Sequence, residues 1–457
     1  MQAMQSWFLA ALLGTATASM LWKAERFPLL AWIAHAPLGL ALLWCTPAQA
    51  AVAGALAGGF GSAPSVSIRE FRALLPITTI PSALALCLGS ALGAHAIAAL
   101  GTFWLALVLP GTVLMGLMPL RVLGAPRWVS NPLACTQERC LAMVHTARAF
   151  GDLGTTSLLV LFASGTALVF ASRNLSVLVV ALGVPTIALG FFALGVANLR
   201  AAVKRMDAAP RLRVAAVVAD RPPRDNLDGL LPIEFADDNV DAAEHRYHPL
   251  VTRAASEGAE LIMLPEVSLH VDANSRERWI GAITTWAQTH GVTLVAPFFD
   301  ASAPVNTLAV IDSGGILATY DKQHPARGME PPRRKRCEPG PTLMQSRCGE
   351  VPLSTVICVD LDYGDMVGPV RAAGGLLAVP ANDMFGGFDR RHHRTAIWAA
   401  VTTGVSTLRA TGHGISAAYD GAGRLLGASS SESGPVVLTL DVPLSPPRPR
   451  HRRRDPR

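Results

Sequence analysis

The stretch LSTVICVDLDYG, residues 353–364, decides how the second half of this chain is interpreted. Its first residues are largely apolar or β-branched, which is typical of a buried β-strand, and after Cys358 the run gives way to acidic residues and a glycine. Loops beyond strand ends often carry reactive groups on a rigid scaffold. Most free cysteines are nevertheless small buried hydrophobes. Position alone therefore leaves Cys358 open as a nucleophile or as a packing residue.

Further strand-like runs lie on both sides of this stretch and are separated by turns and amphipathic segments. They cover 213–219, 260–266, 292–299, 306–312, 353–360, 375–383, 405–411 and 436–442. Helices are predicted between them, at 239–257, 275–290 and 390–404. Strands that alternate with helices and hairpins predict a layered α/β domain over residues 211–443.

The part of the chain before this domain contains far fewer charged residues. Only 13 Asp, Glu, Lys and Arg residues lie within 1–199, out of 39 basic and 33 acidic residues in the whole chain. The charge-free runs are long enough for transmembrane helices, which need about 20 apolar residues. We expect a membrane domain with about seven crossings, near 6–22, 28–45, 47–62, 74–92, 94–119, 153–172 and 175–198. A single soluble domain is excluded.

Two of these crossings have alternatives. The segment 47–62 is short and rich in Ala and Gly, so it is either a buried span or a re-entrant or interfacial piece. The first run lacks a basic start, and more apolar runs follow it, so a retained anchor is favoured over a cleaved signal peptide.

Basic segments flank the α/β domain. Residues 200–210 are predicted to be a basic linker, and residues 444–457 a disordered basic tail that is either solvated or in contact with anionic lipid head groups. No aromatic or folded nucleic-acid reader accompanies the tail, so we expect no nucleic-acid partner. With seven crossings, Lys and Arg gather on the side of the α/β domain, which by a positive-inside count would be cytoplasmic.

Two further residues could take part in catalysis together with Cys358. Glu266 ends the apolar run ELIMLPE, and Lys322 lies in YDKQHP. A carboxylate can take the proton of a thiol, and a fixed cation can stabilise the oxyanion of a tetrahedral intermediate. Acidic residues also end other strand-like runs, at Asp300 and Asp360, so this pattern alone is weak.

Together, Glu266, Lys322 and Cys358 resemble the Glu-Lys-Cys triad of the nitrilase superfamily of carbon–nitrogen hydrolases, in the same chain order. The resemblance covers about 211–443. It implies an αββα sandwich in which Glu266 is the general base, Lys322 stabilises the oxyanion and Cys358 is the nucleophile.

Within that superfamily the chain most resembles the apolipoprotein N-acyltransferases, bacterial inner-membrane enzymes with a multi-span region before the catalytic domain. Several short motifs carry this resemblance. They are Lys322-x-His324 with Glu330, Ala381-Asn382-Asp383-Met384-Phe385-Gly386, His392, and Arg409-Ala410-Thr411-Gly412-His413-Gly414. The resemblance implies that Glu330 holds Lys322 or Glu266 in position, and that the other motif residues shape the substrate site.

The same resemblance implies substrates and a location. The acyl donor would be a membrane phospholipid, and the acceptor the N-terminal amine of a lipoprotein. No metal or organic cofactor is required. The α/β domain would lie on the periplasmic side of the bacterial inner membrane, against the Lys and Arg count. The segment 326–343, with its RRKR at 333–336, would offer positive charge to lipid phosphates, or would simply be a solvated basic loop.

Departures from the family leave other functions open. Val359-Asp360 stands where the family has Tyr-Glu, and AIWAAVTT at 396–403 lacks the family's arginines and glutamate. An eighth span after the domain is also missing. One alternative is a membrane-tethered amidase or another acyltransferase, such as the TraB-like proteins encoded with conjugal transfer systems. A catalytically inactive scaffold is a further alternative, which the intact triad opposes.

The remaining His and Cys residues show no strong pattern. His392-His393 is expected at a surface helix start rather than in a metal site, because no cysteine pair with zinc spacing accompanies it. Two cysteine pairs are either disulfides or free thiols, since spacing cannot decide pairing. They are Cys135 with Cys140 and Cys337 with Cys348.

Overall fold

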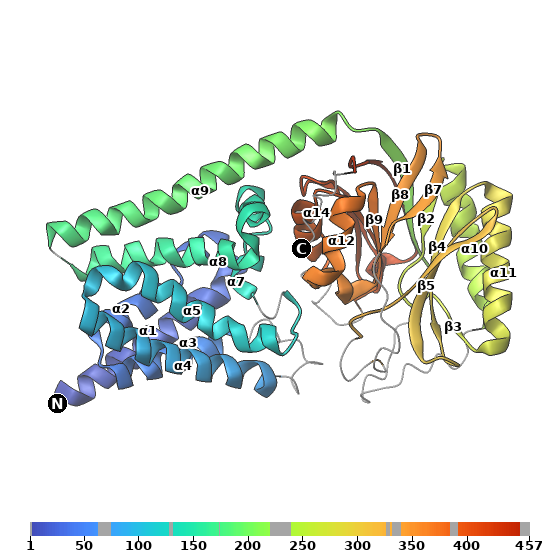
Figure 1. The fold of residues 1–457 in the computed structure, drawn as a ribbon. Coiled ribbons are helices and arrows are strands. Elements are labelled where there is room, and N and C mark those ends of the chain that lie inside the picture. The colour runs from blue at the N-terminus through green and yellow to red at the C-terminus, as the bar shows by residue number, and fades with distance from the viewer. Residues whose placement is uncertain are drawn as a thin grey trace, which may run out of the picture. The chain divides into compact units, whose positions relative to one another are not determined.

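The computed structural model describes residues 2–62, 75–127, 131–172, 174–219, 239–325, 330, 340–383 and 392–447. The chain divides into two compact units, Met1–Arg200 and Ala201–Arg457 (Figure 1). The first is helical, and the second is built on two β-sheets.

The first unit consists of helices and short 3-10 turns. Its elements are α1 (Gln2–Ala24), η1 (Pro28–Trp32), α2 (Ala36–Trp44), α3 (Pro47–Ser62), α4 (Leu75–Leu100), η4 (Thr102–Trp104), α5 (Leu105–Val122), α7 (Pro132–Cys135), α8 (Leu141–Ala171) and α9 (Leu175–Asp207). Four helical stretches among the described residues are long and apolar enough to cross a membrane, namely Thr79–Leu100, Thr102–Val122, Leu141–Ala171 and Leu175–Asp207. These stretches match the last four predicted crossings.

The first three predicted crossings coincide with α1, with η1 and α2, and with α3. Helix α3 has 16 residues, fewer than the roughly 20 that a perpendicular crossing needs. It packs with its backbone close to its neighbours, because a Cβ at Gly58 would lie 2.5 Å from the carbonyl oxygen of Ser82 in α4. Small residues permit this close packing in lipid. Seven crossings therefore remain a prediction.

The predicted basic linker is largely helical. Residues 200–207 are the C-terminal turns of α9, and β1 begins at Arg211. At the other end, Leu444 and Ser445 were expected in the disordered tail, but both are buried, and Ser445 pairs with Gly375. Residues 448–457 lie outside the described residues.

The second unit contains two mixed sheets. The first has the order β13-β1-β2-β4-β5-β6 with β3 beside β4, and the second has the order β12-β11-β10-β9-β8-β7. The strands of the first sheet are β1 (Arg211–Val218), β2 (Leu261–Met263), β3 (His270–Val271), β4 (Thr293–Asp300), β5 (Val305–Asp312), β6 (Gly315–Asp321) and β13 (Val436–Pro443). Those of the second are β7 (Thr342–Ser346), β8 (Gly349–Thr355), β9 (Leu376–Asn382), β10 (Ser406–Gly412), β11 (Ile415–Tyr419) and β12 (Leu425–Ser430).

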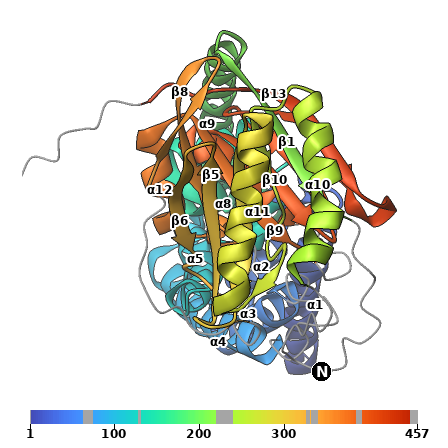
Figure 2. The same cartoon turned by 90° about the vertical axis from the view of Figure 1, so that its right-hand side faces the viewer.

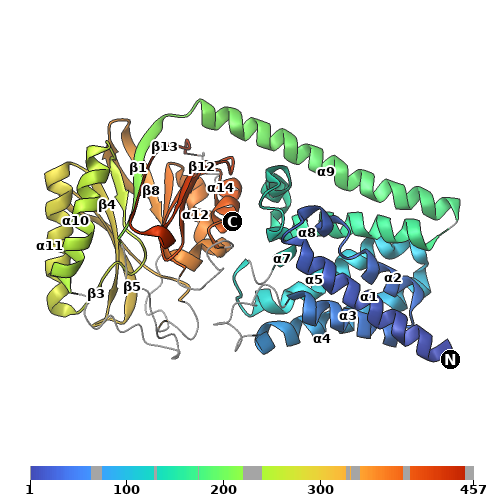
Figure 3. The ribbon, with the colours of Figure 1, turned by 180° about the vertical axis from the view of Figure 1, so that it is seen from behind.

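Helices cover the outer face of each sheet, which gives four layers. Helices α10 (Val240–Ser256) and α11 (Ala273–His290) lie on the first sheet (Figure 2). Their side chains Tyr247, Trp279 and Trp286 belong to the buried apolar cluster on this face. Helices α12 (Gly364–Ala373) and α14 (Thr395–Thr403) pack beside β8 and β10 of the second sheet (Figure 3). This arrangement confirms the predicted αββα sandwich.

The core between the sheets is apolar. Its members from the two sheets include Val214, Met263, Leu308, Leu353, Leu376 and Leu408, all fully buried. Central strands β1, β2 and β4 run parallel, as do β8, β9 and β10. Strands that are buried on both faces have continuous apolar sequences, and for this reason they could be predicted from the sequence.

Candidate active site

Loops that follow the parallel strands of both sheets carry the candidate residues. Glu266 follows β2, Cys358 follows β8 and Asp383 directly follows β9. Parallel neighbours end at the same edge of a sheet, so their loops lie together. Lys322 directly follows β6, whose partner β5 runs antiparallel to β4, and this topology returns Lys322 to the same edge.

Lys322 lies at the centre of a buried ionic cluster. Its Nζ lies 2.7 Å from Glu266 Oε1 and 2.7 Å from Glu330 Oε2. Asn306 Nδ2 donates to Glu266 Oε1 and to Glu330 Oε1, at 2.8 Å each. Burial opposes the charge on Lys322, but the carboxylates of Glu266 and Glu330 outweigh it and raise the lysine pKa well above its usual value. Lys322 is thus a fixed cation at neutral pH.

Cys358 begins the 3-10 turn η5 (Cys358–Asp362) and is 7% exposed. Its φ of +52° is unusual for a residue with a side chain. Val267 and His413 also have positive φ, at +50° and +54°. Such strained backbone persists where the surroundings over-determine it, and it clusters at functional sites.

The Cys358 thiol is protonated at rest. Burial raises its pKa well above the usual value, and the Glu266 carboxylate raises it further, while Lys322 acts in the opposite direction. The thiolate is the nucleophilic form. The proton must therefore leave as the sulfur attacks, and this requirement matches the presence of a neighbouring carboxylate.

Asp360 links the lysine loop to the cysteine turn. Its carboxylate accepts hydrogen bonds from the Tyr320 hydroxyl at 2.7 Å, from Gln323 N at 3.2 Å and from His324 N at 2.7 Å. Burial raises the pKa of Asp360 to about 6, although Lys322 and the hydrogen bond from Tyr320 act in the opposite direction. Asp360 was not among the residues predicted for the site, yet it contacts both the lysine loop and the turn that carries Cys358.

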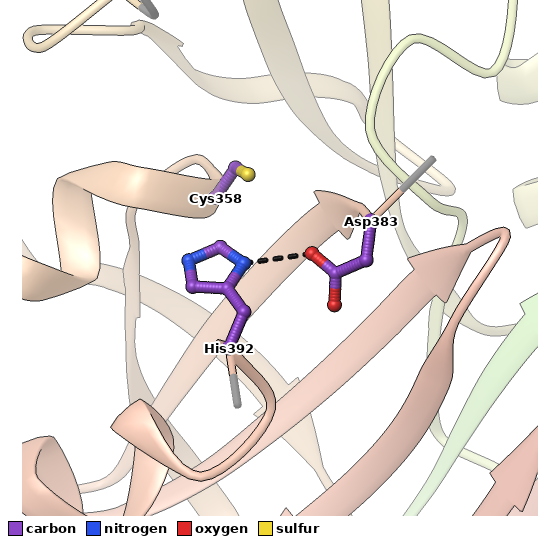
Figure 4. Close-up of side chains that lie close together, drawn as sticks. All are labelled: Cys358, Asp383 and His392. Carbon is purple, nitrogen blue, oxygen red and sulfur yellow. Dashed lines mark hydrogen bonds and ion pairs between the residues drawn. The ribbon is translucent and has the colours of Figure 1, made fainter. Parts of the chain in front are cut away.

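A second buried cluster lies beside Cys358 (Figure 4). Asp383 Oδ1 lies 2.7 Å from His392 Nδ1 and accepts from Arg409 Nη2 at 2.9 Å. Burial opposes the charge on Asp383, but Arg409 and His392 outweigh it and lower the pKa of Asp383. Burial and Arg409 oppose protonation of His392, whereas Asp383 and Asp362 outweigh them and raise its pKa.

The comparisons with known proteins assign this unit to a family. Residues 234–447 match the family described as carbon-nitrogen hydrolase. These residues form a carbon–nitrogen hydrolase domain. No curated protein matches the chain.

Solved structures similar to the chain include an amidase from Nesterenkonia sp., with 22% identity, coverage of 51% of this chain and 91% of that one, and a TM-score of 0.41. A cysteine-to-alanine mutant of the Nesterenkonia AN1 amidase from the nitrilase superfamily is also similar, with 22% identity, coverage of 52% and 93%, and a TM-score of 0.41.

The carbon–nitrogen hydrolase domain brings most of the predicted residues to one edge. Glu266, Lys322 and Glu330 are in direct contact. His324 instead stacks on Tyr363, with ring centroids 3.6 Å apart, so its side chain lies beside η5 rather than on the ionic cluster. Asn382 ends β9 in register with Gly412. Phe385, the basic segment 333–336 and Cys337 lie outside the described residues.

Two expectations need correction in the carbon–nitrogen hydrolase domain. The strand predicted over 353–360 stops at Thr355, because Cys358 takes a positive φ and starts a 3-10 turn. His392 was expected on a surface, but it is 1% exposed because Asp383 and Arg409 bind its ring. Arg409 is fully buried, and its place beside His392 was not predicted. The sequence feature that could have indicated its burial is that it is the lone charge in the apolar run VSTLRAT.

The cysteine pairs are resolved in part. Cys135 and Cys140 form no disulfide with each other, and Cys348 is a free thiol. The disulfide alternative is therefore wrong for Cys135 with Cys140.

Proposed function

We propose that the carbon–nitrogen hydrolase domain is the catalytic unit of a membrane-bound acyltransferase, with Cys358 as its nucleophile. The observation that carries the proposal is the buried Lys322 ammonium, held between Glu266 and Glu330 and electrostatically coupled to the Cys358 thiol. Acyl transfer through a thioester requires a nucleophile, a general base and a group that stabilises the oxyanion. The thiol, the carboxylate and the buried cation supply these three functions.

The first half-reaction forms the thioester. Glu266 takes the thiol proton as Cys358 Sγ bonds to the carbonyl carbon of the donor ester, and the carbonyl oxygen becomes an oxyanion beside Lys322. A donor aimed at such an oxyanion is worth about 2.7–4 kcal/mol. The carbonyl then reforms, the carbon–oxygen bond to the leaving alkoxide breaks, and Glu266 returns the proton to that alkoxide.

The second half-reaction returns the enzyme to its resting state. An amine attacks the thioester carbonyl and loses a proton to Glu266, again through an oxyanion beside Lys322. The carbon–sulfur bond then breaks, and the thiolate regains the proton from Glu266. The products are an amide and free Cys358.

The donor is a membrane phospholipid and the acceptor is the N-terminal amine of a lipoprotein. Apolar helices before the domain support a lipid substrate, because moving an acyl chain into water costs about 0.8 kcal/mol per methylene. The motif resemblance to apolipoprotein N-acyltransferases supports the acceptor. This function places the domain on the periplasmic side of the bacterial inner membrane.

An amidase is the second candidate, and α14 favours it. The segment AIWAAVTT is almost wholly buried and carries none of the charges that the acyltransferases have there. In an amidase, water replaces the amine in the second half-reaction and Cys358 keeps its role.

A paired assay on the detergent-solubilised full chain separates the candidates. One arm supplies phospholipid and a diacylglyceryl peptide, and the other supplies simple primary amides. We expect lysophospholipid and triacylated peptide in the first arm, with Cys348→Ser active and Cys358→Ala inactive. Ammonia release without lipid transfer would replace the acyltransferase with the amidase. Inactivity of the folded protein in both arms would refute both candidates.

A further inference from the structure

Asp360 connects two segments that are distant in sequence and that both belong to the candidate active site. It lies in the 3-10 turn η5 and is fully buried. Its Oδ1 accepts a hydrogen bond from His324 N at 2.7 Å. Its Oδ2 accepts from Gln323 N at 3.2 Å and from Ile357 N at 3.4 Å. Gln323 and His324 belong to the lysine loop that follows β6, and Ile357 directly precedes the nucleophile. One carboxylate therefore binds the backbone of both segments.

The partners of Asp360 require a carboxylate. Three of its four hydrogen bonds come from backbone N–H groups, which can only donate, and the fourth comes from the Tyr320 hydroxyl. An ionised carboxylate offers about four lone pairs and no hydrogen, so it can accept from all four groups. Because N–H groups face both of its oxygens, an asparagine would turn its NH₂ group toward a donor in either orientation. A neutral residue of the same shape therefore does not replace Asp360.

These bonds fix the distance between the lysine and the thiol. Burial and Glu266 raise the pKa of Cys358, and Lys322 acts against them as a nearby positive charge. The strength of that interaction depends on the distance between the two charges. The Glu266 and Glu330 carboxylates bind the ammonium group itself. Asp360 instead joins the backbone from which Lys322 extends to the backbone that carries Cys358.

We propose that Asp360 is a positioning residue that fixes Lys322 relative to Cys358 and thereby sets the reactivity of the thiol. It acts through the backbone of the two segments and not on the reacting atoms. The φ of +52° at Cys358 supports this role, because strained backbone persists only where its surroundings over-determine it. The inference rests on Cys358 as the nucleophile of the proposed function, but on neither the acyl donor nor the acceptor.

The test measures thiol reactivity in the full chain in detergent and needs no acyl donor. Iodoacetamide labels the thiols, and peptide mass spectrometry follows Cys358 and the exposed Cys348 in the same sample. The labelling rates are compared in a double-mutant cycle of the parent, Asp360→Asn, Lys322→Met and the double variant. Any direct effect of the lost Asp360 charge on the sulfur occurs in both backgrounds, so the cycle isolates the effect that passes through Lys322.

We expect Asp360→Asn to slow labelling of Cys358 more in the parent than in the Lys322→Met background, by a factor of at least about three. This factor corresponds to about half a unit in the pKa of the thiol. Labelling of Cys348 should not change. If Asp360→Asn fails to fold, Tyr320→Phe replaces it, because it removes one donor to the carboxylate and keeps the ring; it should show the same dependence on background with a smaller factor.

Asp365→Asn is the matched control, since it removes a half-exposed acid that lies 3.4 Å from His324 Nε2 and does not contact the cysteine turn through any described hydrogen bond. It should leave both labelling rates unchanged. With a short soluble ester, Asp360→Asn should lower kcat and leave KM within about twofold, as expected when only the transition state is affected. A parent protein that shows the expected cycle but transfers no acyl chain would refute the proposed function and support the role of Asp360. Equal slowing in the two backgrounds, for whichever variant folds, would overturn that role.

Discussion

Lys322→Met removes the cation at the centre of the candidate site while keeping a side chain of similar length. Lys322 Nζ lies 2.7 Å from both Glu266 Oε1 and Glu330 Oε2, so the substitution leaves two buried carboxylates without their cation. Breaking a buried ion pair from one side costs about 3–5 kcal/mol. At about 2–4 °C per kcal/mol for a domain of this size, we expect a fall in melting temperature on the order of 10 °C.

The same substitution removes the group beside the oxyanion. Loss of one oxyanion donor lowers kcat by about 10²–10³-fold. The double variant Lys322→Met/Glu330→Gln separates the two effects, because it removes one uncompensated carboxylate and should recover part of the lost melting temperature. It should recover none of the lost kcat, since the oxyanion still has no cation.

Thermal unfolding and turnover of a short soluble ester provide the assay, with Asp365→Asn as a matched control that removes a half-exposed acid outside the ionic cluster. The control should change neither quantity by a measurable amount. If folded Lys322→Met keeps kcat within about threefold of the parent protein, Lys322 does not stabilise the oxyanion. The same conclusion follows if the double variant recovers kcat together with stability, because Lys322 would then have only a structural role.

Four further predictions follow from named contacts. Arg409 and His392 lower the pKa of Asp383, so the ionised Asp383 stabilises the folded protein above the unfolded pKa of 3.8, and this stabilisation is lost as pH falls through the folded pKa. The melting temperature of the parent protein should therefore exceed that of Asp383→Asn by less at pH 3 than at pH 5. A difference that does not change with pH would contradict this. Gly54→Ala should destabilise the helical unit because a Cβ there collides with the Leu86 carbonyl oxygen, whereas Gly59→Ala, 3.5 Å from the Ala83 side chain, should be tolerated in the same thermal assay. A topology reporter fused after Pro443 should be active only in the periplasm, and cytoplasmic activity would reverse the proposed orientation. Neutralising 333–336 should impair turnover of long-chain anionic lipid more than that of a short ester, and equal effects would remove this segment from lipid binding.

Residue patterns located the layers of the domain because the central strands are buried on both faces. Strands β1, β4 and β9 are apolar almost throughout, so they stand out against the turns around them. Strands β7 and β12 were missed because they lie at the edges of the second sheet with mixed burial, and their sequences TLMQS and LLGASS carry no clear alternation.

The part of the candidate site that depends on the order of residues along the chain was predictable from the sequence. The part that depends on tertiary contacts was not. Glu266, Lys322 and Cys358 were proposed because their chain order resembles the Glu-Lys-Cys triad of the nitrilase superfamily, whereas their positions after strand-like runs were weak signals. The positive φ of Cys358 and the burial of His392 were not predicted, since both depend on groups distant in sequence. A pair of adjacent histidines gives no local signal that a buried arginine from β10 will lie beside it.

Mass spectrometry of the peptide containing Cys358, after incubation of the full chain with phospholipid and no acceptor, shows directly whether Cys358 carries the acyl group. We expect a mass increase of one fatty acyl chain on Cys358, lost on treatment with hydroxylamine and absent from Cys358→Ala. Release of lysophospholipid by folded protein with the acyl chain on another residue, or with Cys358→Ala equally active, would contradict this expectation.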